Sequence, residues 1–223
     1  MSSLVQGKLV KCDGSNVSNG YVVLEFGNQI LFSEVTNGDF QFSAVRCSNE
    51  ADFSVRGYDL DNLQSTGNLN YTFGTPTTNL GIVPVCSALT EYIVYQFKQN
   101  GVVYPPRYIF EGITAKPDPL NPNFDLAIIG KPLDDAQYYI LLGFNTTVPG
   151  SYSNNELDLS ILHTVGNSSS WLHFYTENDN FASYNLSQFG GVGEYIDVSF
   201  HGSGLTNGSP IEVNGYAHVL RDQ

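Results

Sequence analysis

The chain has 223 residues, of which 41% are hydrophobic and 13% aromatic, enough to form the core of one large or two small domains. Its formal net charge is −13 without any cluster of Lys or Arg, which argues against binding to nucleic acid or to an anionic membrane surface. No run of about 18 apolar residues occurs, so no transmembrane helix is predicted.

Short runs of aromatic and β-branched residues alternate with Gly-containing two-residue turns along the chain. The clearest turns are Gly27-Asn28, Asn37-Gly38 and Asn207-Gly208. Such dipeptides between apolar runs are the strongest local signal for β-hairpins. The pattern therefore predicts an all-β protein with antiparallel sheets.

The composition changes near Cys86, where 87–90 is predicted to be a short linker. Residues 1–87 have the size of one small immunoglobulin-like β-sandwich. Residues 88–223 are predicted to form a larger antiparallel sandwich or barrel.

The first two turns set the expected strand pairing of the N-terminal domain. Counting outward from them predicts that Leu31 faces both Leu24 and Ala44, and that Val35 faces Phe40. One buried sheet face would then hold Val22, Leu24, Phe26, Leu31, Val35, Phe40, Phe42 and Ala44. Later strands are expected at Asp52–Tyr58, Asn70–Phe73 and Leu80–Val85.

Nine strands are predicted in the second domain. They are Glu91–Lys98, Arg107–Ala115, Phe124–Gly130, Gln137–Phe144, Glu156–His163, Ser170–Thr176, Ala182–Leu186, Gly193–Ser203 and Pro210–Leu220. The last two form the clearest hairpin, with the predicted inward pairs Ile196–Val219, Val198–Ala217 and Phe200–Gly215. The outward set is Tyr195, Asp197, His201, Asn214, Tyr216 and His218.

Three cysteines, Cys12, Cys47 and Cys86, each end an apolar run. Strand ends can meet at one rim of a sandwich, so a disulfide between two of the three is expected. The alternative is three small buried apolar side chains. A bond from Cys12 to either partner would stabilise the fold by about 4 kcal/mol.

Two segments carry a family resemblance. Residues 5–22, VQGKLVKCDGSNVSNGYV, resemble the opening strand and turn of carboxypeptidase-regulatory-like domains, although Asn16 stands where Pro is common. Residues 36–42, TNGDFQF, are similar to a later segment of that family with Thr, Gly and alternating Phe. The resemblance covers residues 5–86 and implies a transthyretin-like sandwich that is a non-catalytic module attached to other machinery.

The resemblance also implies a location. The three cysteines are similar to the variant found in surface lipoproteins of Bacteroidetes, and residues 193–205 resemble a hairpin in the C-terminal parts of lipoproteins from those bacteria. This implies an extracytoplasmic protein at the cell envelope or outer-membrane surface. No signal peptide is visible, so export would imply a trimmed leader, which is where a lipid anchor would have been attached.

Acidic turns suggest a calcium site. Asp59 and Asp61 directly follow a predicted strand, and oxygen-rich loops on extracellular β modules can hold Ca²⁺. Asp and Asn are also the usual turn residues, and no EF-hand pattern is present. No other cofactor is expected.

Aromatic residues suggest a ligand surface. Trp171, Tyr195 and Tyr216 are the main candidates for stacking on sugar rings, with Tyr138, Tyr139 and Tyr175 as further ones. The alternative is that most aromatic side chains fill the core or cross-strand positions.

No catalytic constellation emerges. Asp197 and His218 are expected to face each other on the last hairpin, where a simple cross-strand pair is favoured over an oriented general base because no nucleophile accompanies them. Paired carboxylates could serve a polysaccharide hydrolase. The available residues are Glu111, Asp125, Glu156, Asp158 and Glu194.

These observations predict a non-enzymatic cell-envelope β module that binds a surface glycan or an envelope protein. The alternatives are a polysaccharide-acting hydrolase and a purely structural spacer. A glycan site should present exposed rings beside hydroxyl-binding polar groups.

Overall fold

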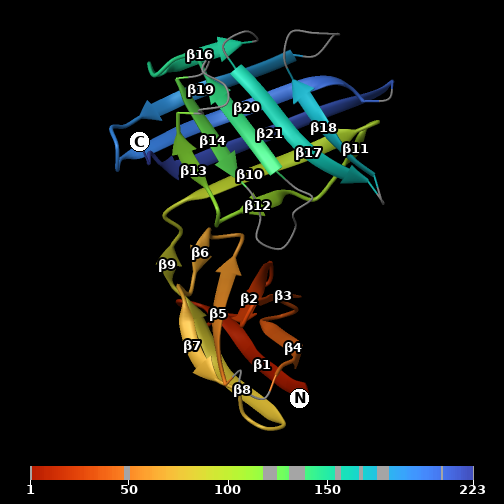
Figure 1. The fold of residues 1–223 in the computed structure, drawn as a ribbon, viewed down its shortest axis with the longest axis vertical. Coiled ribbons are helices and arrows are strands. Elements are labelled where there is room, and N and C mark those ends of the chain that lie inside the picture. The colour runs from red at the N-terminus through yellow and green to blue at the C-terminus, as the bar shows by residue number, and fades with distance from the viewer. Residues whose placement is uncertain are drawn as a thin grey trace. The chain divides into compact units, whose positions relative to one another are not determined.

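The computed structural model describes residues 2–47, 51–117, 125–130, 139–153, 157–165, 168–174, 181–206 and 208–222. All regular elements in these ranges are β-strands, which confirms the all-β prediction (Figure 1). The chain divides into two compact units, Met1–Leu89 and Thr90–Gln223. The predicted linker begins with a short strand, Ser87–Ala88, that belongs to the first unit. Within the described residues, no helix is long and apolar enough to span a membrane.

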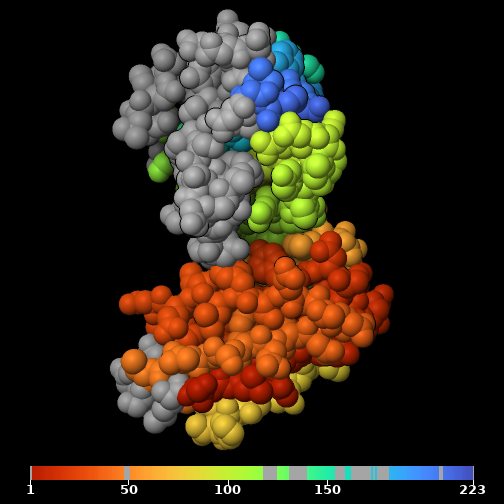
Figure 2. Space-filling view, turned by 90° about the vertical axis from the view of Figure 1, so that its right-hand side faces the viewer, coloured from red at the N-terminus to blue at the C-terminus, as the bar shows by residue number. Residues whose placement is uncertain are grey.

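Unit 1 is built from two sheets. The smaller has the order β4 (Asp39–Val45), β1 (Ser2–Lys11) and β8 (Thr77–Val85), with β1 and β8 parallel. The larger has the order β3 (Gln29–Glu34), β2 (Gly20–Phe26), β5 (Asp52–Asp59), β6 (Gln64–Ser65) and β9 (Ser87–Ala88), with β7 (Leu69–Thr72) also paired to β5. Seen from the side, red and orange residues of the N-terminal strands cover this unit, and yellow β8 residues lie at its lower end (Figure 2).

The turn at 37–38 does not join a hairpin ladder, so the predicted pairing of β3 with β4 is wrong. Asn37 and Gly38 both have positive φ, 53° and 85°, and a bridge between Thr36 and Asp39 closes the turn. Beyond that bridge the strands separate, because the Val35 amide donates to Gly20 O of β2 at 3.0 Å. β4 instead pairs with β1 in the other sheet.

The predicted buried residues nevertheless share one core. Leu24 pairs with Leu31 as expected, and β2 and β4 supply apolar side chains from opposite sheets to the same cluster. Alternation along each strand decides which side chains point inward, whichever sheet the strand joins. The burial prediction therefore holds, with Leu31 only partly buried against the cluster, although the strand pairing does not.

Unit 2 is built from a seven-stranded and a five-stranded sheet, which form two layers in Figure 1. The larger has the order β11 (Val102–Val103), β10 (Tyr92–Gln99), β21 (Ser209–Leu220), β20 (Tyr195–Thr206), β19 (Phe181–Phe189) and β16 (Gly150–Ser153), with β12 (Arg107–Ile109) also paired to β10. The smaller has the order β13 (Thr114–Lys116), β14 (Leu126–Gly130), β15 (Tyr139–Phe144), β17 (Leu157–Val165) and β18 (Ser168–Phe174). Apolar side chains of both sheets pack into one core.

The predicted hairpin of β20 and β21 is confirmed in register. Ile196 pairs with Val219, Val198 with Ala217 and Phe200 with Gly215. The side chains of this set are buried. The alternate residues of both strands therefore lie on the outward face of the sheet.

The predicted strand Arg107–Ala115 is two strands in different sheets. β12 pairs with β10 in the larger sheet, and β13 pairs with β14 in the smaller one. Gly112, between them, has φ of 65°, a left-handed conformation that an extended strand does not use. The chain crosses here from one layer to the other, which its composition does not reveal.

Candidate functional site

The most distinctive surface of unit 2 is the outward face of β10, β21 and β20. The strand register places Tyr92 beside His218 and His218 beside Asp197. Their neighbours along each strand, such as Ile93 and Val219, are fully buried. The same alternation that builds the core therefore gathers these three polar and aromatic residues on the other side of the sheet.

Asp197 links two side chains of the neighbouring strand. Its Oδ1 accepts a hydrogen bond from Tyr216 Oη at 2.5 Å and lies 2.6 Å from His218 Nδ1. The side chains of Asp197 and His218 are 14% and 25% exposed. Two groups on one carboxylate oxygen fix the orientation of both rings.

Aromatic rings surround this pair. Tyr195 stacks on His218 with ring centroids 4.2 Å apart and planes 14° from parallel. The Tyr92 ring lies 5.5 Å from that of His218 and 5.9 Å from that of Tyr216. We call the group Tyr92, Tyr195, Asp197, Tyr216 and His218 the aromatic patch.

Two more rings extend the same face beyond β10. Tyr108 of β12 pairs with Val94, two residues along from Tyr92. Its ring stacks on that of Phe110 with centroids 5.7 Å apart. The outward surface therefore continues across β12 as a row of rings.

Two phenols of the patch, Tyr92 and Tyr216, have a raised pKa. Burial, followed by the hydrogen bond and charge of Asp197, raises the pKa of Tyr216 far above its usual value. Burial and the charge of Asp197 also raise the pKa of Tyr92. Both hydroxyls therefore act near neutral pH as hydrogen-bonding groups and not as bases.

A second carboxylate stands at the end of the patch. Glu91 Oε1 accepts a hydrogen bond from the Leu220 amide at 2.8 Å. Burial raises the pKa of Glu91, and the charge of Asp222 acts in the same direction. The Leu220 hydrogen bond and the charge of His218 oppose this shift without cancelling it.

Polar side chains continue the face toward β19 and β16. Ser199 pairs with Asn185, whose Oδ1 accepts a hydrogen bond from Ser151 Oγ at 3.1 Å. His201 Nδ1 lies 2.9 Å from Asn214 Oδ1 on the next row. The sheet thus presents aromatic rings at one end and hydroxyl, amide and imidazole groups beside them.

The structure brings together two of the three predicted ligand residues. Tyr195 and Tyr216 both belong to the patch. Trp171 lies in β18 of the other sheet, and its side chain is outside the described part of the chain, as are those of Tyr138, Tyr139 and Tyr175. Sequence reasoning missed Tyr92, because only the pairing of β10 with the distant β21 reveals its place.

The predicted calcium residues form a hydrogen-bonded turn. Asp59 is fully buried, and its carboxylate accepts hydrogen bonds from the Asp61 amide at 3.1 Å and from Asn62 Nδ2 at 2.7 Å. Asp61 accepts from Asn19 Nδ2 at 2.8 Å and from Ser18 Oγ at 3.3 Å. Among the described residues, no group of three or more His, Cys, Asp or Glu side chains could hold a metal ion.

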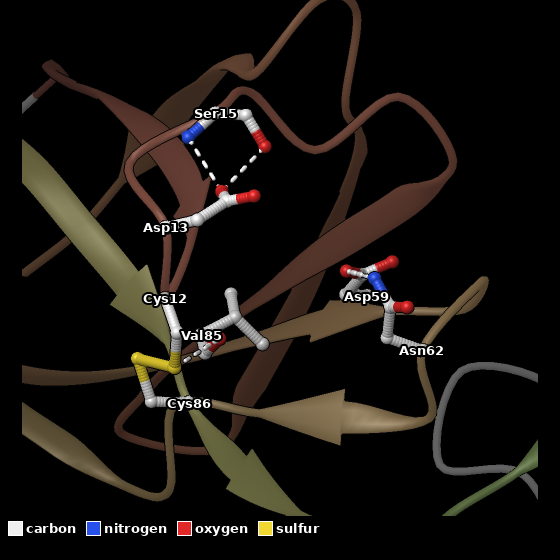
Figure 3. The surroundings of a disulfide bond; sticks show 7 residues. All are labelled: Cys12, Asp13, Ser15, Asp59, Asn62, Val85 and Cys86. Carbon is white, nitrogen blue, oxygen red and sulfur yellow. Dashed lines mark hydrogen bonds between the residues drawn. A yellow bond between two sulfur atoms is a disulfide. The ribbon is translucent and has the colours of Figure 1, made fainter.

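Cys12 and Cys86 form a disulfide at the ends of β1 and β8 (Figure 3). The parallel pairing ends at Lys11 and Val85, so the next two residues are neighbours, with Cα atoms 5.2 Å apart. Cys47 is exposed and takes no part in this bond.

Beside the disulfide, the loop after β1 is closed by its own side chains. Asp13 Oδ1 accepts hydrogen bonds from Ser15 Oγ at 2.6 Å and from the Ser15 amide at 2.8 Å (Figure 3). These bonds lower the pKa of the Asp13 carboxyl below its usual value. The loop is thus a local structural turn at the rim of unit 1.

The carboxylates proposed for a hydrolase gain no support from their contacts. Glu194 Oε2 accepts a hydrogen bond from the Gly191 amide at 2.8 Å, within its own turn. Asp125 is exposed before β14. Glu111 lies between β12 and β13, Glu156 is outside the described residues, and so is the side chain of Asp158.

An open depression of about 470 Å³ in unit 1 is a weaker candidate. Its rim includes Glu25, which forms an ion pair with Arg56, and Asp52, which accepts a hydrogen bond from Thr72 Oγ1 at 2.9 Å. Both carboxylates therefore already bind side chains of the sheet itself.

Comparisons with known proteins do not change this picture. No family model, curated protein or solved structure matches the chain. The resemblance of residues 5–86 to carboxypeptidase-regulatory-like domains therefore stays a prediction.

Proposed function

We propose that this protein is a non-catalytic carbohydrate-binding module and that the aromatic patch is its binding surface. The observation that carries the proposal is the stack of Tyr195 on His218 beside the shared carboxylate of Asp197, on a solvent-facing sheet. Flat rings stack on the apolar faces of sugars, and nearby carboxylate, amide and hydroxyl groups bond the sugar hydroxyls.

The patch is also held in place before any ligand arrives. Asp197 fixes Tyr216 and His218 by hydrogen bonds, and Tyr195 is fixed by stacking. Side chains that are already ordered lose little conformational entropy on binding, which improves affinity. The polar row that includes Ser199 and Asn185 gives a longer glycan further groups to contact.

A non-catalytic role is supported by what accompanies the Asp197–His218 pair. In the described part of the chain, the hydrogen bond of His218 goes to Asp197, and no serine or cysteine joins it. An oriented histidine without a nucleophile lacks the arrangement of a hydrolytic triad. The pair instead organises a surface.

A position at the cell envelope is supported by the disulfide between Cys12 and Cys86. Such bonds persist in oxidising compartments outside the cytoplasm. Alkylation of the natively isolated protein without reductant, followed by mass measurement, should modify one thiol. Modification of all three would argue for a reducing compartment.

The binding proposal is tested with a glycan array and a panel of soluble polysaccharides. Tyr195→Ala should lower the affinity for any bound glycan at least about tenfold, because it removes the stacking ring. The matched control is Tyr104→Ala, since Tyr104 is 42% exposed and lies outside the patch. No glycan binding, or binding that both variants retain, would overturn the proposal and favour a protein-binding or spacer role.

A further inference from the structure

We infer that the ligand of the aromatic patch is an uncharged glycan whose hydroxyl groups donate hydrogen bonds to Asp197. This inference rests on the proposed function and adds the chemical class of the ligand. It is carried by two observations, the hydrogen-bonding capacity of the patch and the charges around it.

The patch offers acceptors to a ligand. Tyr216 Oη donates a hydrogen bond to Asp197 Oδ1, and His218 Nδ1 lies 2.6 Å from the same oxygen. The second carboxylate oxygen of Asp197 has no hydrogen-bond partner among the described residues. A partly buried carboxylate oxygen with spare lone pairs accepts hydrogen bonds strongly, and a sugar hydroxyl is a suitable donor.

The charges around the patch disfavour an anionic ligand. Asp197 belongs to it, and the Glu91 carboxylate, which accepts the Leu220 amide, lies close enough to interact electrostatically with His218. Lys98 lies six residues further along β10 than Tyr92 and forms an ion pair with Glu212 at 3.2 Å.

Arginine does not supply the missing positive charge. The Arg221 guanidinium lies over the Phe189 ring and donates to Gly190 O at 3.3 Å. Arg107 has the same strand parity as the buried Ile109, which places it toward the other side of the sheet. A uronate or sulfated sugar would therefore bring negative charge to Asp197 without a lysine or arginine of the described residues to match it, which costs binding free energy.

Asp197 does not form an open anionic site either. Its side chain is only 14% exposed and already has two hydrogen-bonding partners. It therefore meets a ligand at one oxygen, beside the stacked ring of Tyr195. This combination suits a neutral sugar, which offers both an apolar ring face and hydroxyl donors.

The test ranks polysaccharides by affinity for the unmodified full-length protein. Neutral glucan, xylan, mannan and galactan are compared with polygalacturonate, alginate, hyaluronan and chitosan, by affinity electrophoresis and then calorimetry. Low ionic strength is used because charge effects are least screened there. The tightest ligand that depends on Tyr195 should be a neutral polymer.

Asp197→Asn provides the second measurement. It should lower the affinity for the neutral ligand roughly tenfold, because a charged acceptor becomes a neutral one. It should also reduce the difference in affinity between neutral and acidic polymers. Glu212→Gln is the matched control, since it removes a carboxylate from the same face outside the patch. It should change neither property.

Two failures can be told apart. If no glycan binds in a manner that Tyr195→Ala abolishes, the proposed function fails. If the tightest Tyr195-dependent ligand is acidic or cationic, the function stands and the inference about its ligand is wrong. The ranking uses the unmodified protein, so it remains decisive even if Asp197→Asn folds poorly.

Discussion

The two units are both β-sandwiches, but they are held together differently. Among the described residues, the buried apolar cluster has 15 members in unit 1 and 24 in unit 2. Unit 1 adds the Cys12–Cys86 disulfide and the fully buried carboxylate of Asp59. A smaller domain buries less apolar surface, and a disulfide offsets part of that difference.

This comparison predicts that perturbations affect one unit at a time. Each unit has its own core cluster, so calorimetry of the full chain should resolve two unfolding transitions. A substitution confined to one unit should shift the transition of that unit and leave the other in place.

The largest effect is expected from loss of the disulfide. Replacing Cys12 and Cys86 by Ser should destabilise unit 1 by about 4 kcal/mol, because the bond closes a long loop and restricts the unfolded chain. Differential scanning calorimetry should show the transition of unit 1 at lower temperature and that of unit 2 unmoved. Cys47→Ser is the control and should leave both in place. An equal shift of both transitions would contradict the separation of the units.

A core change in unit 2 should give the converse result. A Cβ at Gly215 would collide with the Phe200 ring and lie 2.7 Å from Val94 O. Gly215→Ala should therefore lower the unfolding free energy of unit 2 by about 1–3 kcal/mol. Gly191→Ala is the control, since its nearest atom would be 3.6 Å away. A stability loss in unit 1 would show that the cores are coupled.

The buried turn of unit 1 should contribute less to stability than the disulfide does. Asp59→Ala removes the acceptor of two hydrogen bonds and should lower the unfolding free energy of unit 1 by about 1–3 kcal/mol. Asp61→Ala, at an exposed position, should cost under about 1 kcal/mol. Added Ca²⁺ should leave the transition of unit 1 unmoved, because both carboxylates already accept hydrogen bonds. A stabilisation by Ca²⁺ that both variants abolish would establish the calcium site instead.

Local sequence signals predicted the interior of this protein better than its topology. The β20–β21 hairpin followed from its turn and from alternation, and its register is as expected. The turn at Asn37-Gly38 is present and has positive φ at both residues, yet its flanking strands enter different sheets. A turn dipeptide specifies four residues and does not decide which partner the strands find beyond them.

The candidate site shows the same limit. Asp197, Tyr216 and His218 could be placed together because one hairpin holds them. Tyr92 joins them only through the pairing of β10 with β21, and Trp171 lies in another sheet for the same kind of reason. Pairing between strands distant in sequence depends on how the whole core assembles, which spacing along the chain does not reveal.

The smallest effect is expected from Glu91, and it depends on pH. Burial raises the pKa of Glu91 in the folded state above its usual value of 4.5. At pH values between 4.5 and the folded-state pKa, the native state therefore binds more protons than the unfolded chain. The stabilising contribution of protonated Glu91 is thus fully present below about pH 4.5 and is lost as pH rises through the folded-state pKa.

Glu91→Gln should therefore match the unmodified protein in acid and become more stable toward neutral pH. The gain should stay under about 1 kcal/mol, because the side chain is partly exposed and solvent screens its charge. Gln keeps an oxygen to accept the Leu220 amide, so the change isolates the charge. Calorimetry of the transition of unit 2 at about pH 4 and about pH 7 measures the difference in stability between the variant and the unmodified protein. A difference independent of pH would mean that packing, and not the buried charge, sets the contribution of this residue.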